Sequence, residues 1–102
     1  MTDRIYTFGG RVPDWNLIPA HMREGVKLWI EKGVLPGDFL AAFLRNDLKE
    51  TFVRADDINK QRIGDFVTFF YMYAPINCWG SPENMTEWMK RGGLDGNGRT
   101  VP

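Results

Sequence analysis

Apolar side chains recur at helical spacing along most of the chain, beginning at Pro19. From there to Gly33, one set of positions three or four residues apart is apolar: Met22, Val26, Trp29 and Ile30. Residues at this spacing lie on one side of a helix, so the pattern predicts an amphipathic helix over residues 19–33. Proline is favoured at the first helical position and glycine at the cap that ends a helix, which agrees with both bounds.

Two shorter helices are predicted next, separated by a break at Asn46. The first of them is predicted from a dense apolar stripe that consists of Phe39, Leu40, Phe43 and Leu44. This helix should end near Arg45. Asparagine tolerates the left-handed conformation that ends a helix. Asp47 stands three residues before Glu50, which is the spacing of a capping box at a helix start. A further helix is therefore expected over residues 48–55.

The longest helix is predicted over residues 58–73. Its apolar face consists of Ile63, Phe66, Val67, Phe70 and Ala74. The residue before a proline is pushed out of helical geometry, so this helix should stop before Pro75. Its second half is apolar on nearly all sides, which is typical of a helix that is buried or lies at an interface. A last helix is predicted to start at Ser81, a hydroxyl cap followed by proline and an acid, and to end at Gly92.

Both ends of the chain are expected to lie outside the helices. Residues 4–8 alternate and are rich in β-formers, which predicts a short strand, or an ordered arm if no strand pairs with it. The glycine-rich segment 95–102 is expected to be a flexible tail. We therefore predict an all-α fold, a compact bundle of four or five helices with or without a short N-terminal β-strand. It forms one domain over residues 1–94, of which residues 1–14 are the arm.

The composition narrows the kind of partner. The chain of 102 residues carries 13 basic and 13 acidic residues, so it has no overall field that would attract nucleic acid or a membrane surface. A single cysteine, Cys78, and a single histidine, His21, cannot form an internal disulfide or a Cys/His zinc site. The chain has no apolar leader and no membrane-length apolar stretch, so we expect a protein of the cytoplasm.

Catalytic chemistry is not predicted. Cys78 and His21 lie far apart in the chain without a supporting motif, so we interpret Cys78 as a buried apolar residue. Asp47, Asp56 and Asp57 could together hold Mg²⁺, but helix capping explains Asp47 and one of the other two. No enzyme activity, cofactor or metal is therefore expected.

Protein binding is the first of two open interpretations. A protein partner, or a second copy of the chain in a homo-oligomer, would contact surplus aromatic side chains. The candidates are Tyr6, Trp15, Tyr71 and Tyr73. The alternative is that all of these aromatic residues pack in the core of the domain.

Binding of a nucleotide-type small molecule is the second interpretation. Trp79 could stack on a base, and the free N–H groups at the helix start after Ser81 could meet a phosphate. Arg54, Arg62 or Lys60 would supply positive charge. The motif has no glycine-rich phosphate loop, and the alternative role for Trp79 is to fill the core.

Five ordered motifs resemble those of a family of small proteins from tailed-phage and prophage genomes. They are residues 18–22 (IPAHM), 35–40 (LPGDFL), 46–48 (NDL), 54–59 (RADDIN) and 78–83 (CWGSPE). The resemblance implies a non-enzymatic phage accessory protein in the cytoplasm of the bacterial host, and it carries over no catalytic or binding residue. Small phage proteins of this kind often counter host defence, so we expect binding and inhibition of a host protein. Sequestration of a nucleotide signal is the alternative.

Overall fold

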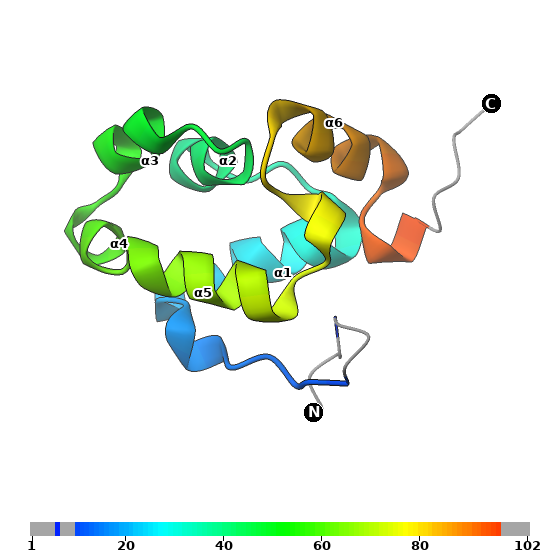
Figure 1. Ribbon diagram of the computed structural model, residues 1–102, viewed down its shortest axis with the longest axis horizontal. Coiled ribbons are helices and arrows are strands. Elements are labelled where there is room, and N and C mark those ends of the chain that lie inside the picture. Colours follow the sequence, from blue (N-terminus) through cyan, green and yellow to red (C-terminus); the bar gives the residue numbers. More distant parts are fainter. Residues whose placement is uncertain (1–5, 7–9, 97–102) are drawn as a thin grey trace.

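All regular secondary structure in the part of the chain that the computed structural model describes, residue 6 and residues 10–96, is helical (Figure 1). The α-helices are α1 (Arg23–Lys32), α2 (Asp38–Leu44), α3 (Leu48–Arg54), α4 (Asp57–Gln61), α5 (Ile63–Tyr73) and α6 (Pro82–Arg91). Four 3₁₀ turns accompany them: η1 (Trp15–Leu17), η2 (Ala20–Met22), η3 (Ile76–Cys78) and η4 (Leu94–Gly96). The predicted all-α fold is confirmed, with six α-helices in the described residues rather than four or five.

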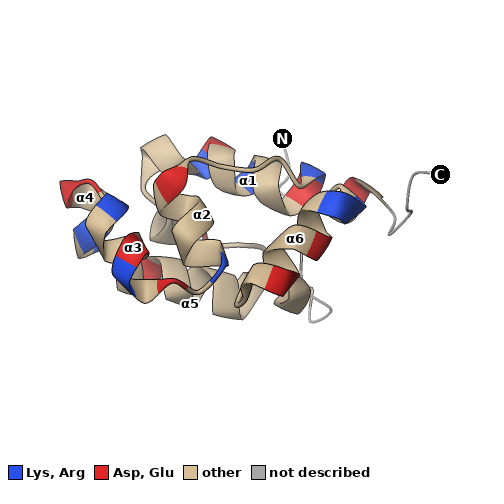
Figure 2. Cartoon of the chain, turned by 90° about the horizontal axis from the view of Figure 1, so that it is seen from above, with Lys and Arg blue, Asp and Glu red and all other residues tan. Residues whose placement is uncertain are grey.

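The helices surround a core rich in aromatic side chains. In Figure 1, α2, α3 and α6 lie above α4 and α5, and the view from above in Figure 2 places α1 on the opposite side of the molecule from α5. Large side chains from three helices are fully buried: Trp29 of α1, Trp88 of α6, and Phe66, Phe69 and Phe70 of α5. The second half of the segment predicted as the longest helix is therefore central to the core.

Side-chain caps place the helix starts where the sequence predicts them. The carboxylate of Asp47 accepts a hydrogen bond from the backbone N–H of Glu50 at 3.2 Å at the start of α3. The hydroxyl of Ser81 accepts one from the N–H of Asn84 at 3.0 Å at the start of α6. Asn46 adopts the predicted left-handed conformation, with φ of 64°. These boundaries depend on short-range hydrogen bonds, which is why local sequence predicts them.

The prediction of one continuous helix over residues 58–73 is wrong. The chain breaks at Arg62, where φ is −113° and ψ is 13°, and this residue separates α4 from α5. The guanidinium group of Arg62 donates hydrogen bonds to the carboxylate of Asp65 at 2.7 Å and to the backbone carbonyl of Asn16 in η1. A tertiary contact with the N-terminal segment thus accompanies the change of direction.

The first helix also differs from its prediction at its start. Residues 20–22 form the 3₁₀ turn η2, and regular α-helix begins at Arg23. The predicted end at Gly33 is confirmed, since Gly33 adopts the left-handed conformation with φ of 68°. Most of the predicted N-terminal strand, residues 4–8, lies outside the described residues, and Tyr6 has no regular secondary structure. Of the predicted tail, Asp95 and Gly96 belong to η4, where the carboxylate of Asp95 lies 2.7 Å from the Nζ of Lys32.

Buried tryptophan side chains connect three segments that are distant in sequence. The indole N–H of Trp88 in α6 donates to the backbone carbonyl of Trp29 in α1 at 2.9 Å. The indole N–H of Trp29 in turn donates to the carbonyl of Cys78 in η3, also at 2.9 Å. Both side chains are almost fully buried, so each bond satisfies polar groups that water does not reach.

The C-terminal ends of α1 and α6 meet backbone to backbone. A methyl group built on Gly93 would lie 2.6 Å from the backbone atoms of Glu31, Lys32 and Gly33. Gly93 also has a positive φ of 71°. Only glycine allows two helix ends to approach this closely in this conformation.

Candidate functional site

An apolar groove lies between α3, α5 and the segment that leads into α6. It has a volume of about 350 Å³, and the residues that line it are Phe43, Asn46, Leu48, Thr51, Ile63, Val67, Trp79 and Gly80. In Figure 1, α3 and the start of α5 lie in the left-hand part of the molecule, and the segment that leads into α6 lies near its middle. None of these lining side chains is ionisable, so the groove offers contact area and little charge.

Trp79 forms part of the groove on a rigid support. Its ring stacks on Phe43 of α2, with centroids 5.5 Å apart and an angle of 13° between the planes. Its backbone carbonyl accepts a hydrogen bond from the side-chain amide of Asn84 at 2.8 Å. The N–H of the next residue, Gly80, donates to the carbonyl of Leu44 at 2.8 Å. The sequence leaves open whether Trp79 is exposed or buried, and in the structure it is half-buried.

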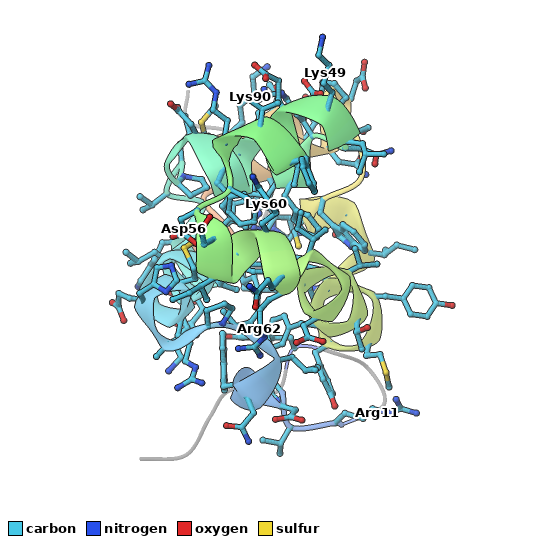
Figure 3. The ribbon with its side chains drawn as sticks, turned by 90° about the vertical axis from the view of Figure 1, so that its left-hand side faces the viewer. Arg11, Lys49, Asp56, Lys60, Arg62 and Lys90 are labelled. Carbon is cyan, nitrogen blue, oxygen red and sulfur yellow. The ribbon has the colours of Figure 1, made fainter. Side chains whose placement is uncertain are left out.

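The α3 wall of the groove exposes apolar side chains. Thr51 is the only buried residue of α3, whereas Leu48 is 74% and Phe52 is 52% exposed. The ammonium group of Lys60 in α4 lies 4.9 Å from the centre of the Phe52 ring, which is a cation–π distance. Figure 3 shows Lys49 on α3 and Lys60 on α4 on this side of the molecule. The groove therefore opens beside an apolar rim with lysines near it.

A more open depression of about 500 Å³ adjoins the groove at the start of α6. Arg45, Asp47, Ser81 and Pro82 are among the residues that line it. The hydroxyl of Ser81 already caps α6, and Arg45 lies 3.5 Å from the carboxylate of Asp47. The Ser81 hydroxyl and the Arg45 guanidinium, two of the groups that could meet a phosphate here, are thus engaged within the protein.

The predicted nucleotide-binding residues are not gathered at one place. Arg54 faces acids on two sides, with Asp38 at 3.6 Å and Glu50 at 3.7 Å from its guanidinium nitrogens. Arg62 bonds to Asp65 and to the carbonyl of Asn16, and Figure 3 shows it directed toward the N-terminal segment. Neither arginine lines the groove that contains Trp79.

The four predicted partner-binding aromatics have different surroundings. Tyr6 is only 9% exposed, and its hydroxyl donates to the carboxylate of Glu31 at 2.7 Å. Trp15 packs on Phe69 with ring centroids 4.8 Å apart, and Tyr73 packs on the same ring at 5.6 Å. Tyr71 is 82% exposed. Tyr6 therefore belongs to the core, Trp15 and Tyr73 pack against it, and Tyr71 is the exposed one of the four.

Cys78 and His21 have separate surroundings. Cys78 is fully buried, and burial raises the pKa of its thiol well above the ordinary range, so the thiol stays protonated. The Nε2 atom of His21 lies 3.1 Å from the carboxylate of Asp56 at the start of α4. Within the described residues, no group of three or more histidine, cysteine or acidic side chains could hold a metal ion.

Asp56 both caps α4 and faces His21. The N–H of Asn59, at 2.7 Å, is the main cause that lowers the pKa of the Asp56 carboxyl below its ordinary value, and the hydrogen bond with His21 lowers it further. Because the pKa is lower in the folded protein than in the unfolded chain, ionised Asp56 stabilises the fold above its unfolded pKa. This stabilisation is lost as the pH falls through the folded pKa.

We predict that Asp56→Asn makes the protein less stable than wild type at pH 7, because asparagine can still cap a helix but carries no charge. The difference should stay constant above the ordinary pKa of aspartate, shrink as the pH falls below it, and vanish once the pH has fallen through the lowered pKa of Asp56 in the folded protein. Urea unfolding at a series of pH values measures both free energies of unfolding. If the difference in free energy of unfolding stayed constant over the whole pH series, the charge of Asp56 would not be what stabilises the fold.

No protein-family model, curated protein or solved structure matches this chain. The relationship to phage proteins that the five motifs suggest therefore stays a prediction from the sequence. Among the helices of the described residues, none has the length and apolar character needed to cross a membrane. A function is therefore inferred from the geometry of the groove and from the exposed apolar residues beside it.

Sequence reasoning misses most of the groove. The helical pattern assigns Phe43, Ile63 and Val67 to core-facing stripes and gives Leu48 no role. A signal is present in α3, since its apolar residues Leu48, Phe52 and Val53 do not fall on a single helical face. Such a short helix cannot bury all three against one neighbour.

Proposed function

We propose that this chain is a binding protein, without enzyme activity, whose groove receives an apolar side chain of a partner protein. The groove supports this proposal because its walls are uncharged and because Trp79 and Phe43 form a stacked, preorganised aromatic surface. Large apolar side chains that fill rigid pockets supply most of the free energy at protein interfaces. Leu48, at 74% exposure beside the groove, is the single observation that carries the proposal.

A protein partner is favoured over a nucleotide by the distribution of charge. A bound phosphate needs cations or free N–H groups that point at it. Arg54 and Arg62 bond to groups outside the groove, and Arg45 pairs with Asp47. The groove itself offers apolar contacts, which suit a protein side chain better than a phosphate.

The resemblance to phage and prophage proteins supports a host protein as the partner. On this proposal the chain acts in the cytoplasm of the bacterial host, and it inhibits a host protein by occupying one of its surfaces. The burial of Cys78, whose thiol stays protonated, fits action by binding rather than by nucleophilic catalysis.

Leu48→Asp is the variant that tests the proposal. Leu48 is the first residue of α3 and is exposed, so aspartate there should leave the fold intact while it places a charge at the apolar rim. The matched control is Val53→Asp, because Val53 is 63% exposed on the same helix and does not line the groove. We expect Leu48→Asp to weaken binding by at least about tenfold and Val53→Asp to leave it unchanged.

The measurement starts with affinity purification of both variants and of wild type from phage-infected cells, with mass spectrometry for proteins and small molecules. A protein that wild type and Val53→Asp retain and that Leu48→Asp loses is then titrated against the purified variants. Equal retention by all three chains would remove the groove as the binding site. Release of a nucleotide on heat denaturation, lost in Trp79→Ala, would instead replace protein binding by nucleotide sequestration.

A further inference from the structure

An exposed cation is held in place beside the groove. Lys60 of α4 is exposed, and its ammonium group lies 4.9 Å from the centre of the Phe52 ring in α3. The face of an aromatic ring attracts a positive charge, so this contact restrains an otherwise flexible side chain. In Figure 3, Lys60 lies between the ribbons of α3 and α4, whereas Lys49 lies beyond α3 on the side away from α4. Lys60 is therefore the lysine that faces the space between these helices.

Both members of this contact adjoin residues that line the groove. Phe52 follows Thr51 directly and stands one turn of α3 after Leu48, and Thr51 and Leu48 line the groove. Lys60 stands three residues before Ile63, which lines the groove from α5. The ammonium group of Lys60 is thus fixed at the rim of an apolar site.

The acids of α3 and α4 leave this cation without an ion pair. Glu50, the acid of α3, lies 3.7 Å from the guanidinium group of Arg54. Asp57 of α4 and every other carboxylate of the described residues lie more than 4 Å from the Lys60 ammonium group. Because the side chains that line the groove are uncharged, the rim of the groove is positive at Lys60.

We propose that the groove binds a segment of a partner protein in which a carboxylate side chain stands close to the large apolar side chain that enters the groove. This inference rests on the proposed function and adds the charge of the partner to it. The apolar side chain packs on Trp79 and Phe43, and the carboxylate meets the ammonium group of Lys60. Opposite charges at the rim of an interface speed association, and a basic segment would face a like charge here.

The position of Lys60 also predicts the spacing of the two groups in the partner. From Leu48 to Phe52 is four residues, or about 6 Å along the axis of α3. A helical partner covers this distance in three or four residues, and an extended one in about two residues. We therefore expect the acidic residue within about four positions of the apolar one.

Selection from a library of short random displayed peptides, with the purified protein as bait, tests this inference. Wild type should enrich peptides that carry aspartate or glutamate within about four positions of a large apolar residue. Lys60→Glu should instead enrich lysine or arginine at that place, because the sign of the rim charge is reversed. Lys60 is exposed, so far-UV circular dichroism should show an unchanged fold.

Lys27→Glu is the matched control for the change of charge. The ammonium group of Lys27 in α1 lies 5.0 Å from the centre of the Trp15 ring, so this variant also loses a lysine from an aromatic ring. Lys27 does not line the groove. Lys27→Glu should therefore select the same acidic peptides as wild type.

Titration of one synthetic peptide selected by wild type measures the size of the effect. We expect Lys60→Gln to weaken binding by about three- to fivefold and Lys60→Glu by about tenfold, since an exposed ion pair contributes little. Replacing the acidic residue of the peptide with lysine should restore binding to Lys60→Glu. Added salt should weaken the binding of wild type more than that of Lys60→Gln.

The Leu48→Asp variant separates failure of this inference from failure of the proposed function. Wild-type peptides without an acidic preference that Leu48→Asp loses would overturn the inference and leave the groove as the binding site. An acidic preference that persists in Lys60→Glu, or no enriched peptide at all, would overturn the inference as well. Retention of the same peptides by Leu48→Asp would overturn the proposed function, and this inference with it.

Discussion

Replacing Gly93 with alanine is expected to destabilise the fold by about 3 kcal/mol or more. The new methyl group would lie 2.6 Å from the backbone of Glu31, Lys32 and Gly33, which α1 cannot move without losing its contact with α6. Alanine is also strained at the positive φ of 71°. Strain at positive φ costs about 1–3 kcal/mol and overpacking costs a similar amount.

Gly92→Ala is the matched control for this prediction. Gly92 has a similar φ of 81°, but the nearest atom to its added methyl group would be the Cα of Gly96 at 3.5 Å. This variant therefore carries the conformational strain without the clash and should lose about 1 kcal/mol. Urea unfolding followed by far-UV circular dichroism measures both losses. Equal losses would mean that the contact between the two helix ends contributes nothing to stability.

Trp29→Phe is expected to cost about 2–4 kcal/mol. Phenylalanine keeps an aromatic ring but lacks the indole N–H that bonds to the carbonyl of Cys78 at 2.9 Å. That carbonyl belongs to a fully buried residue, so it would be left without a donor in a place that water does not reach. The smaller ring also leaves a cavity in the core, because the Trp29 side chain is fully buried.

The same substitution at Trp79 provides the comparison. The ring of Trp79 stacks on Phe43 and is half-buried, and no hydrogen bond of its indole nitrogen occurs within the described residues. Phenylalanine can keep the stack, so Trp79→Phe should cost less than about 1.5 kcal/mol. Thermal and urea unfolding of the two variants should therefore differ clearly. A loss at Trp79 as large as that at Trp29 would show that the buried hydrogen bond is not the cause.

Local sequence predicted those helix ends whose hydrogen bonds lie within a few residues. Asp47 and Ser81 cap α3 and α6 by bonding to N–H groups three residues ahead. Gly33 and Gly92 end α1 and α6 in the left-handed conformation that glycine adopts at little cost. Each of these boundaries depends on short-range geometry, so it can be predicted without knowledge of the rest of the fold.

The break between α4 and α5 could not be predicted in this way. The apolar pattern runs on through Arg62, and the contact that accompanies the turn is made with Asn16, which is distant in sequence. The roles of the aromatic residues depend on the same kind of contact. The sequence does not distinguish Tyr6 and Trp15 from Tyr71, since all three are aromatic residues that could bind a partner. In the structure Tyr6 bonds to Glu31 and Trp15 packs on Phe69, whereas Tyr71 is exposed.

The amino-acid sequence by itself determined the all-α class, the amphipathic helices and most of their ends, because helix periodicity and capping act over a few residues. Tertiary structure alone decided which apolar side chains remain exposed. A groove forms where α3 and α5 approach the segment before α6. The sequence of one of these elements does not reveal where the other two lie. Packing between distant segments determines how much of each side chain water can reach, and that exposure defines the candidate site at Leu48 and Trp79.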